Sequence, residues 1–322
     1  MPELPEVGTV RQILRTEIIG KTIREIEIYK PEDKTKERKS LIKKISEEEF
    51  INALIGKTIH EIDRKGKYLF FILTNQEKIK THALVSHLGM TGKYFIEEKI
   101  LDPASKQEQK DLFEKHNTDE SRVLTFYLDD SKKTTKLTYC DARRFGGFIL
   151  QTFDDYKESE PYKIIGTDLL EEKVDTKLLF EYYQKRKVPI KTALLEQNIV
   201  SGIGNIYASE ILFDTKIHPL KRTNQLTKLE VDNIIHSAQK ILKEALNSEG
   251  TSEFDFVNPL GKEGSYQNKL KVYNRKGKPC PNKCGSLIRK LIKEQKEINK
   301  EKINKKKPKE RSTFFCPQCQ VA

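Results

Sequence analysis

Residues 189–213 read PIKTALLEQNIVSGIGNIYASEILF, two apolar, helix-like runs on either side of the turn Gly202-Ile203-Gly204. Glycine supplies the backbone freedom that a tight turn between helices requires, and Asn205 can cap the second helix. The free N–H groups at such a helix start suit a phosphate, although an ordinary helix–turn–helix packing unit is a commoner use of the pattern. The stretch therefore predicts a helical domain and leaves its role open.

The helical pattern extends over residues 169–249. Apolar residues recur at helical spacing in four runs, Lys177–Arg186, Ile190–Leu195, Ile206–Phe213 and Thr227–Glu249. Thr227 followed by Glu230 is a capping-box pattern, which marks the start of the last helix. Beyond this region a glycine-bearing loop leads to a predicted strand at Lys271–Asn274.

Residues 1–152 alternate β-like runs with polar turns. The expected strands are Ile23–Tyr29, Thr58–Asp63, Tyr68–Leu73, Lys80–Leu84, Gly92–Ile96, Arg122–Leu128, Lys136–Tyr139 and Phe148–Thr152. Residues 4–19 have helical spacing after a proline-rich start, and the polar insertions at about 30–49 and 97–121 are expected to be loops. The sum predicts a β-sandwich, followed by a polar linker at 153–165.

Four of the five cysteines fall in two pairs, Cys280-x3-Cys284 and Cys316-x2-Cys319. Short loops between paired thiolates form the knuckles that tetrahedral zinc requires. A redox pair is the main alternative, and it is disfavoured because neither pair lies in a βαβ pattern. Four thiolates close the coordination shell, so the sequence predicts one structural zinc ion that folds a small β-hairpin. Cys140 stands alone and is expected to be a buried thiol.

The chain has 322 residues and a formal net charge of +12, which implies an anionic partner, most often nucleic acid. Residues 289–311 hold eleven Lys or Arg against four acidic residues, so much of the excess lies there. No stretch approaches the roughly 20 apolar residues that span a bilayer, and the acidic N-terminus lacks the apolar core of a signal peptide. We therefore expect an intracellular protein that does not cross a membrane.

The chain begins Met1-Pro2-Glu3-Leu4-Pro5-Glu6-Val7. Removal of Met1 would leave Pro2 as a secondary amine flanked by carboxylates, and terminal amines have a pKa of roughly 7.7–8.0 in peptides. Such an amine can be an unprotonated nucleophile, and its condensation with an aldehyde-level carbon gives an iminium that acts as an electron sink. A structural leader with two surface glutamates is the plainer interpretation, because short motifs often match by chance.

Blocks along nearly the whole chain resemble the formamidopyrimidine-DNA glycosylase family, the bacterial base-excision enzymes for oxidised purines. In family order the blocks are MPELPEV (1–7), RKGKYLFF (64–71), SHLGMTGKY (86–94), DARRFGGF (141–148), GIGNIYASEILF (202–213), LKVYNRKGKPC (270–280) and RSTFFCPQC (311–319). The resemblance implies an α+β multi-domain fold. Its parts would be a catalytic β-sandwich domain with an N-terminal helix at 1–152, a linker at 153–165, a helix–two-turn–helix DNA-binding domain at 166–265, and a four-cysteine zinc-finger hairpin with a Lys-rich insertion at 266–322.

The resemblance also implies the catalytic residues. Pro2 would attack C1′ of the damaged nucleoside and form a Schiff base, and Glu3 would act as the general acid/base that protonates the sugar ring oxygen. Glu6 would assist at the same site, and Lys67 would lie near the lesion and its phosphate. Arg311 would be placed at the site by the zinc hairpin.

The DNA contacts are implied in the same way. A clamp on the backbone phosphates around the flipped nucleotide would consist of His87, Asn205, Tyr273 and Arg311. A wedge that fills the void in the duplex would consist of Met90, Arg143 and Phe145, with Arg143 bonded to the orphaned cytosine. Glu210 is expected to be a structural partner of the Gly204-Asn205 turn or of the N-terminus.

The implied activity is a bifunctional DNA glycosylase and AP lyase that excises 8-oxoguanine and formamidopyrimidines opposite cytosine, followed by β,δ-elimination. The implied partner is double-stranded DNA with oxidised bases, the cofactor is Zn²⁺, and a cytoplasmic, nucleoid-associated bacterial monomer is the default. An endonuclease VIII-like enzyme for oxidised pyrimidines is an alternative, disfavoured by Leu4, where that type has glycine. A non-catalytic DNA-binding relative is a second alternative, disfavoured by the presence of Pro2, Glu3 and Lys67.

The chain departs from the family pattern at several positions. Gly8 stands where the family usually has Glu, and the first cysteine pair encloses three residues in place of two. The second His of a family motif is absent after Lys115-His116. The gap between the cysteine pairs is longer than in the family, and we expect the extra residues, about 290–308, to form a Lys-rich protrusion that could raise nonspecific DNA affinity.

Overall fold

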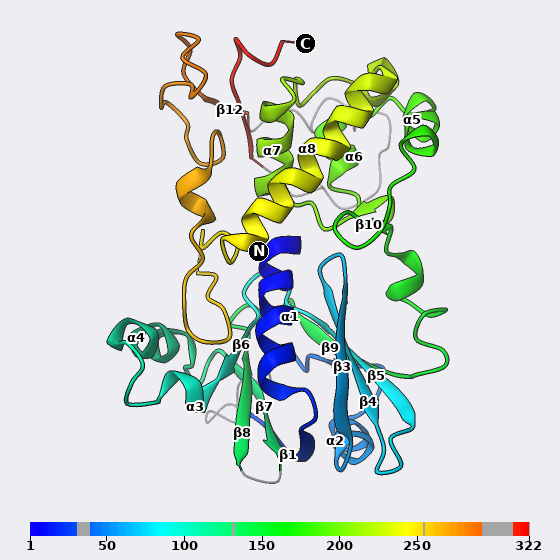
Figure 1. Cartoon of the computed structure of the whole chain (residues 1–322), viewed down its shortest axis with the longest axis vertical. Helices are drawn as coiled ribbons and strands as arrows, with labels where there is room; N and C mark the ends of the chain where they lie inside the picture. The colour runs from blue at the N-terminus through cyan, green and yellow to red at the C-terminus, as the bar shows by residue number, and fades with distance from the viewer. Residues whose placement is uncertain (31–38, 131–132, 254, 292–311, 322) are drawn as a thin grey trace. The chain divides into compact units, whose positions relative to one another are not determined.

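The computed structural model describes residues 1–30, 39–130, 133–253, 255–291 and 312–321 (Figure 1). The chain divides into two compact units, Met1–Ile165 with Ala245–Gln267, and Gly166–Glu244 with Asn268–Ala322. Across the described residues, no helix is both long and apolar enough to cross a membrane. The three-part division at residues 152, 165 and 265 stays a prediction.

Most of the first unit is a nine-stranded sheet, counted over the described residues, in the order β2-β9-β5-β4-β3-β1-β7-β8-β6. The strands are β1 Thr22–Ile28, β2 Ile42–Lys43, β3 Thr58–Lys65, β4 Tyr68–Thr74, β5 Lys80–His87, β6 Lys93–Ile96, β7 Arg122–Asp129, β8 Thr134–Cys140 and β9 Gly147–Thr152. β1 pairs with β3 through the single residue pair Thr22 and Thr58, so the sheet folds over there into two facing layers (Figure 1). The predicted β-sandwich and each of its eight predicted strands are confirmed.

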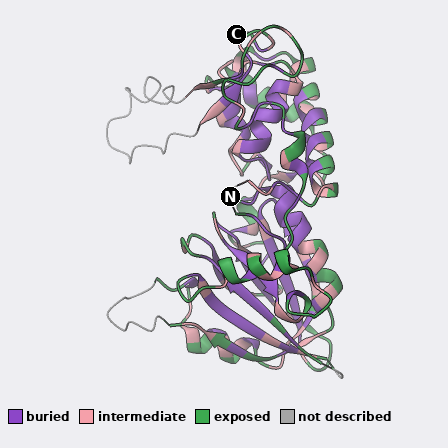
Figure 2. Cartoon of the chain, turned by 90° about the vertical axis from the view of Figure 1, so that its left-hand side faces the viewer, coloured by how far each residue is buried: buried purple, intermediate pink, exposed green. Residues whose placement is uncertain are grey.

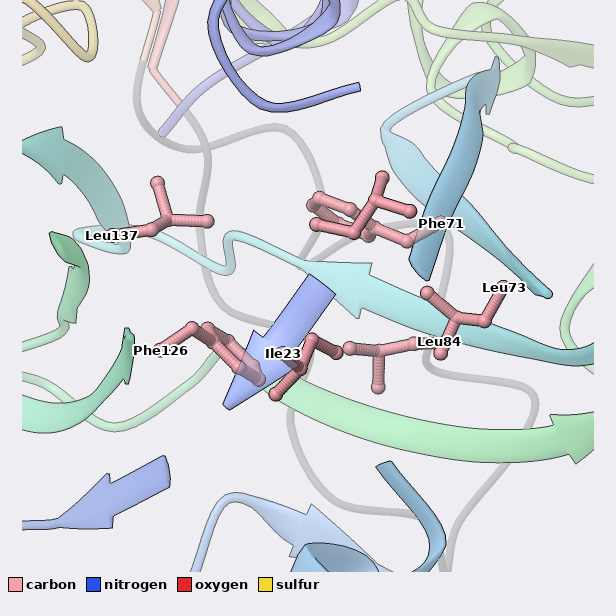
Figure 3. A pocket seen from close by; sticks show the side chains of 7 residues that line it. Ile23, Phe71, Leu73, Leu84, Phe126 and Leu137 are labelled. Carbon is pink, nitrogen blue, oxygen red and sulfur yellow. The ribbon is translucent and has the colours of Figure 1, made fainter. Parts of the chain in front are cut away.

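The core lies between the two layers. Buried apolar residues of β3, β4 and β5 meet those of β1, β7 and β8 in one cluster. Of these strands, β4, β7 and β8 are buried along most of their length (Figure 2). An apolar cavity of about 10 Å³ lies at this junction, lined by Ile23, Ile59, Phe71, Leu73, Leu84, Phe126 and Leu137. Figure 3 shows the side chains that line it. A space of this size is a packing gap between the layers and holds no substrate.

Helix α1, Leu4–Ile18, packs on β3 and β4 and confirms the predicted N-terminal helix. Val7, Val10, Leu14 and Ile18 recur at helical spacing and belong to the sandwich core. Proline, which has no N–H group, is favoured in the first turn of a helix because N–H groups there make no intrahelical hydrogen bond. Pro5 occupies such a position in α1. The core thus fixes α1, and α1 fixes the start of the chain.

The 153–165 segment, expected as a polar linker, carries an aromatic face. Phe153, Tyr156 and Tyr162 join Phe70 in a cluster on the outer side of β4 and β5, with the Phe70 and Tyr162 ring centroids 5.2 Å apart. The ammonium group of Lys65 lies 4.5 Å from the centroid of the Tyr162 ring. This segment is therefore packed on the sandwich along much of its length.

Two predicted loops contain helices, so these predictions were wrong in part. Residues 30–49 include β2 and the start of α2, Glu47–Leu54, which Ser46 and Glu49 cap reciprocally. Residues 97–121 include α3, Glu97–Ile100, and α4, Gln107–His116. Each of these helices rests on one or two apolar anchors, such as Phe113 on α4, and so few anchors produce no detectable periodicity. Residues 31–38 lie outside the described part of the chain.

The second unit is mainly helical. Its helices are α5 Thr176–Gln184, α6 Ile190–Leu194, α7 Asn205–Asp214 and α8 Lys228–Asn247, the last of which ends in the first unit. Two short strands, β10 Thr167–Asp168 and β11 Val200–Ser201, pair in parallel, and a 3-10 turn lies at Thr223–Gln225. Of the other 3-10 turns described, Tyr162–Ile164 lies in the first unit and Tyr266–Lys269 begins there. The four predicted helices are confirmed. The predicted capping box is also confirmed, because Thr227 N–H donates to Glu230 Oε2 at 2.8 Å and Glu230 N–H to Thr227 Oγ1 at 3.2 Å.

The chain ends in a small hairpin of β12, Arg289–Leu291, and β13, Thr313–Phe315. Phe314 of β13 packs on Tyr273 with ring centroids 5.0 Å apart, and Phe315 packs on His218 at the same separation. Of the predicted Lys-rich protrusion at about 290–308, Lys290 and Leu291 belong to β12, and the remainder lies outside the described residues.

Candidate active site and metal centre

The N-terminal turn is buried and held by the carboxylate of Glu6. Pro2 and Glu3 are buried, and Glu6 is 1% exposed. Glu6 Oε2 accepts the Glu3 N–H at 2.8 Å, and Oε1 accepts the Thr251 N–H at 2.7 Å. A buried carboxylate requires such charge-assisted bonds to offset its desolvation. Glu6 therefore ties the residue next to Pro2 to a loop almost 250 positions away in sequence.

The terminal amine lies in a mixed electrostatic environment. In the chain that begins with Met1, burial lowers the pKa of the terminal amine below its ordinary 8.0, and Lys67 and Lys93 act in the same direction. The carboxylates of Glu3 and Glu6 oppose this shift. A lowered pKa raises the fraction of this Met1 amine that is unprotonated at neutral pH.

Lys67 and His87 lie on neighbouring strand ends. Lys67, 7% exposed, follows Gly66 in the β3–β4 turn, where Gly66 has φ +57°, a conformation that glycine adopts without strain. Tyr68 pairs in register with His87 of β5, and their ring centroids are 4.5 Å apart. Gly89 N–H donates to His87 Nδ1 at 3.1 Å, so the neutral ring carries its proton on Nε2. Burial, with Lys67 and Lys43 nearby, lowers the pKa of His87 to about 4.

Met90, Arg143 and Phe145 lie on two loops that a buried aspartate joins. Asp141, fully buried, accepts from Thr91 Oγ1 at 2.5 Å and from the Gly146 N–H at 2.8 Å. Met90 and Phe145 are 38% and 48% exposed, and the Arg143 guanidinium lies 4.9 Å from the centroid of the Phe145 ring. Exposed apolar side chains next to an arginine form a surface suited to insertion between bases.

The loops of Met90 and Phe145 approach closely through glycines. A Cβ on Gly89 would lie 2.4 Å from the backbone nitrogen of Gly146. Gly89 also has φ +61°, so the position requires glycine on both grounds.

Asn205 and Tyr273 both belong to the second unit. Gly202 has φ +100°, and the Gln197 side chain bridges the predicted turn by accepting from Gly202 N–H at 2.9 Å and donating to Ile203 O at 2.8 Å. The predicted capping by Asn205 is wrong, because Gly204 is the N-cap and Asn205 is the first helical residue. Asn205 Oδ1 is buried without a hydrogen-bond partner among the described residues.

Glu210 corrects two further predictions. Its buried carboxylate accepts the N–H groups of three consecutive residues, Lys271 at 2.8 Å, Val272 at 2.9 Å and Tyr273 at 2.8 Å. Its structural role was expected, but its partner is neither the Gly204-Asn205 turn nor the N-terminus. Lys271–Asn274 is not a strand as predicted, because its N–H groups point to one carboxylate in place of a neighbouring strand. Burial raises the pKa of Glu210, and the three backbone bonds oppose this shift.

The four paired cysteines form a candidate metal centre. The Sγ atoms of Cys280, Cys284, Cys316 and Cys319 all lie within 4.8 Å of one another. Cys280 and Cys319 are separated by 3.7 Å, and Cys284 and Cys316 by 3.5 Å. Tetrahedral coordination with metal–sulfur bonds of about 2.3 Å requires sulfur separations of about 3.8 Å, so the donor set fits a closed metal site. In the longer first knuckle, Lys283 and Gly285 take φ +53° and +83°.

Two anchors fasten the hairpin within the second unit. Lys191 of α6, 5% exposed, donates from Nζ to Ser312 O at 2.9 Å and to Thr313 Oγ1 at 3.0 Å. The Gln320 side chain accepts from Cys316 N–H at 2.9 Å and donates to Ile217 O at 2.9 Å. Arg311, a predicted catalytic and phosphate-binding residue, lies outside the described residues. Lys191 thus holds Ser312, the residue that follows Arg311 in sequence.

Three residues of this arrangement carry no signal that sequence reasoning used. Asp141 lies in a quoted family block, yet its role depends on Thr91, fifty positions earlier. Thr251 and Lys191 act through long-range backbone contacts that no local pattern predicts. At Gly8, a Cβ would lie 2.9 Å from Leu246 Cδ1, a close contact that a small shift of the Leu246 side chain can relieve.

The half-buried histidines His87 and His116 make stability depend on pH. Burial also lowers the pKa of His116 to about 4, helped by Lys93 and Lys115. A folded-state pKa below the ordinary 6.5 means that the unfolded chain binds protons first, so the free energy of unfolding is greatest above pH 6.5 and falls as the pH decreases towards 4. Between pH 7 and pH 5, the free energy of unfolding measured with urea should fall less in His87→Gln than in the wild type, by up to about 2 kcal/mol. The exposed His60→Gln is the control, and equal pH dependence in all three proteins contradicts this account.

Family models and similar proteins point to the same protein family. The model described as the formamidopyrimidine-DNA glycosylase N-terminal domain matches residues 1–148, and the formamidopyrimidine-DNA glycosylase H2TH domain matches residues 165–256. A formamidopyrimidine-DNA glycosylase of Mycoplasma mobile is 35% identical over 320 residues, covering 99% of each chain. A complex between Lactococcus lactis Fpg and DNA containing an abasic site is 34% identical with a TM-score of 0.77, covering 99% of this chain and 100% of that one. MutM in complex with DNA containing carbocyclic 8-oxo-G is 34% identical, with a TM-score of 0.76 and complete coverage of both chains. The chain therefore belongs to the formamidopyrimidine-DNA glycosylase family.

Proposed function

We propose that the chain is a base-excision-repair DNA glycosylase and AP lyase that removes oxidised purines, 8-oxoguanine and formamidopyrimidines, from double-stranded DNA. The observation that carries this function is the buried N-terminal turn, in which Pro2 is buried and the next residue, Glu3, is bonded to the Glu6 carboxylate. Family membership and the lesion-containing or abasic DNA in the related complexes support the same substrate class.

In the proposed mechanism, Met1 is removed and the Pro2 nitrogen attacks C1′ of the damaged nucleoside. The bond from C1′ to the base breaks, and the departing base takes up the proton that the Pro2 nitrogen releases. Glu3 then protonates the ring oxygen so that the bond from C1′ to this oxygen breaks and the sugar opens. The iminium formed by this ring opening draws electrons during β,δ-elimination of the backbone. Glu6 assists by holding the Glu3 backbone, and Lys67 lies close enough to influence the charge of the terminal amine.

The remaining site residues are proposed to hold DNA. The void left by the flipped nucleotide would be filled by Met90, Arg143 and Phe145. Two observations support this role: Met90 and Phe145 are exposed, and Arg143 lies over the Phe145 ring. His87, Asn205, Tyr273 and Arg311 would contact backbone phosphates. His87 suits this role as a neutral Nε2–H donor. Tyr273 suits it because its N–H is held by Glu210, a residue of α7, the helix that begins at Asn205.

The metal is proposed to be one structural zinc ion. The four thiolates match its preferred donors and geometry, and they leave no coordination position for a water molecule. When bound, the ion would stabilise the hairpin and thereby the strand that follows Arg311. We further propose a monomer that acts in the bacterial cytoplasm at the nucleoid, with the three-part division given above.

Borohydride trapping tests the nucleophile. A duplex with 8-oxoguanine opposite cytosine should give a covalent adduct with the wild type, and peptide mass spectrometry should place the adduct on Pro2. Pro2→Gly should lose most of this adduct, because the secondary amine and its fixed ring geometry are gone. Mass spectrometry of the intact chain must first show that Met1 has been removed.

Each other outcome of the trapping experiment has a distinct meaning. No adduct with the processed, zinc-loaded chain contradicts the assignment for this lesion. An adduct that forms only with an oxidised pyrimidine supports the endonuclease VIII-like alternative. Tight DNA binding without any adduct supports the non-catalytic alternative.

Metal analysis tests the zinc centre. The purified chain should contain one zinc ion, and Cys316→Ser should lose it together with high-affinity DNA binding, because the hairpin cannot fold without its metal. Cys140→Ser is the matched control and should retain zinc, since Cys140 lies in the sandwich. A metal-free wild type that binds DNA normally, or equal zinc content in both variants, contradicts a four-cysteine zinc site.

A further inference from the structure

Helix α4 lies in a segment expected to be a loop, and one face of it is buried. Gln109 and Phe113 are 8% and 5% exposed, and they are four residues apart on the same helix face. Phe113 stacks edge-on against Phe95 of β6 with centroids 5.2 Å apart. This packing fixes α4 on the sandwich, so α4 can serve as a rigid support for a neighbouring segment.

The supported segment is residues 255–261. Gln109 Nε2 donates to Leu260 O at 2.8 Å, and Val257 is buried in the cluster of Phe95 and Phe113. A Cβ on Gly261 would lie 2.9 Å from Gln109 O, so the two backbones are in close contact. Ile96 N–H donates to Pro259 O at 2.9 Å and adds a bond from β6. At the exposed end, Lys115 Nζ lies 3.6 Å from Asp255 Oδ1.

Gly250 and Thr251, a few positions before this segment, lie against the catalytic turn. Thr251 N–H donates to Glu6, and a Cβ on Gly250 would lie 3.0 Å from Glu6 Cγ. A base whose C1′ is attacked by Pro2 must lie beside the residues that surround this turn. Ser252 Oγ donates to Phe256 O at 2.8 Å and so ties the α4-bound segment to the residues beside the catalytic turn. The position of the segment therefore helps to shape the space that the base enters.

We propose that α4 docks the 255–261 segment and that Gln109 is a positioning residue for damaged-base selection. This inference rests on the proposed glycosylase function and deepens it. Gln109 holds Leu260 through one amide bond, and the docked segment then supports the wall next to the base. The effect is confined to base recognition, because cleavage at a preformed abasic site involves no base.

Gln109→Glu tests the proposal without removing the helix cap. The Gln109 Oε1 atom accepts the Lys106 N–H at 3.3 Å, a bond that glutamate can keep at this favourable position. The new carboxylate cannot donate to Leu260 O and repels it. Gln107→Glu is the matched control. Gln107 is exposed, and the hydrogen bond described for its side-chain amide is to Asp111 on the same helix. Both variants change the charge by the same amount within one helical turn.

Two readouts are needed. The first is the ratio of single-turnover 8-oxoguanine excision to strand cleavage at a preformed abasic site. Gln109→Glu should lower this ratio by about three- to tenfold, the factor that corresponds to one net hydrogen bond, and Gln107→Glu should leave it unchanged. The second readout is amide hydrogen exchange over residues 255–261, which should accelerate in Gln109→Glu alone.

The outcomes separate the docking role from general damage and from the proposed function. An unchanged ratio in Gln109→Glu, or an equal fall in both activities, overturns the positioning role. Wild-type exchange in Gln109→Glu overturns the docking itself. A wild-type chain that cleaves abasic DNA but excises no oxidised purine contradicts the substrate class instead, and the exchange experiment still decides whether α4 docks the segment.

Discussion

The buried carboxylate of Glu6 is the constraint on which the catalytic turn depends. A carboxylate that is 1% exposed is stable only if hydrogen-bond donors replace its water. Here the donors are the N–H groups of Glu3 and Thr251, at 2.8 and 2.7 Å. The first fixes the chain one residue from Pro2, and the second holds Thr251 against α1. One buried side chain thus positions both the proposed nucleophile and its neighbouring loop.

Two other buried carboxylates do the same for other parts of the site. Asp141 joins the loops of Met90 and Phe145 by accepting from Thr91 and Gly146. Glu210 gathers the N–H groups of residues 271–273 and so fixes the backbone of Tyr273. Bonds from N–H groups to a charged acceptor are short and directional, and they hold irregular backbone where no strand or helix does. The catalytic turn, the wedge loops and the clamp segment are each organised in this way.

Local patterns predicted the regular elements and missed the long-range ones. Alternating Ile, Phe and Leu residues are sufficient to predict the sandwich strands, and the cysteine spacing predicts the metal centre, because both signals lie within a few residues. Helix α4 was missed because one apolar anchor, Phe113, gives no periodicity. The Lys271–Asn274 segment has the composition of a strand, but Glu210, some sixty positions earlier, captures its N–H groups. Thr251 likewise reaches Glu6 across the whole chain, and such pairings can be known only from the folded structure.

The most direct test of this account is the rate of Schiff-base formation in Glu6→Gln, measured by borohydride trapping on a preformed abasic site. Glutamine has one acceptor oxygen where two N–H groups need partners, so one buried donor loses its bond at a cost of about 1–3 kcal/mol. If Glu6 positions Pro2, trapping should slow by about tenfold or more while zinc content and DNA affinity stay at wild-type values. Glu17→Gln, at the far end of the same helix, should trap normally. A Glu6→Gln variant that traps at the wild-type rate would contradict the central claim that this carboxylate organises the catalytic turn.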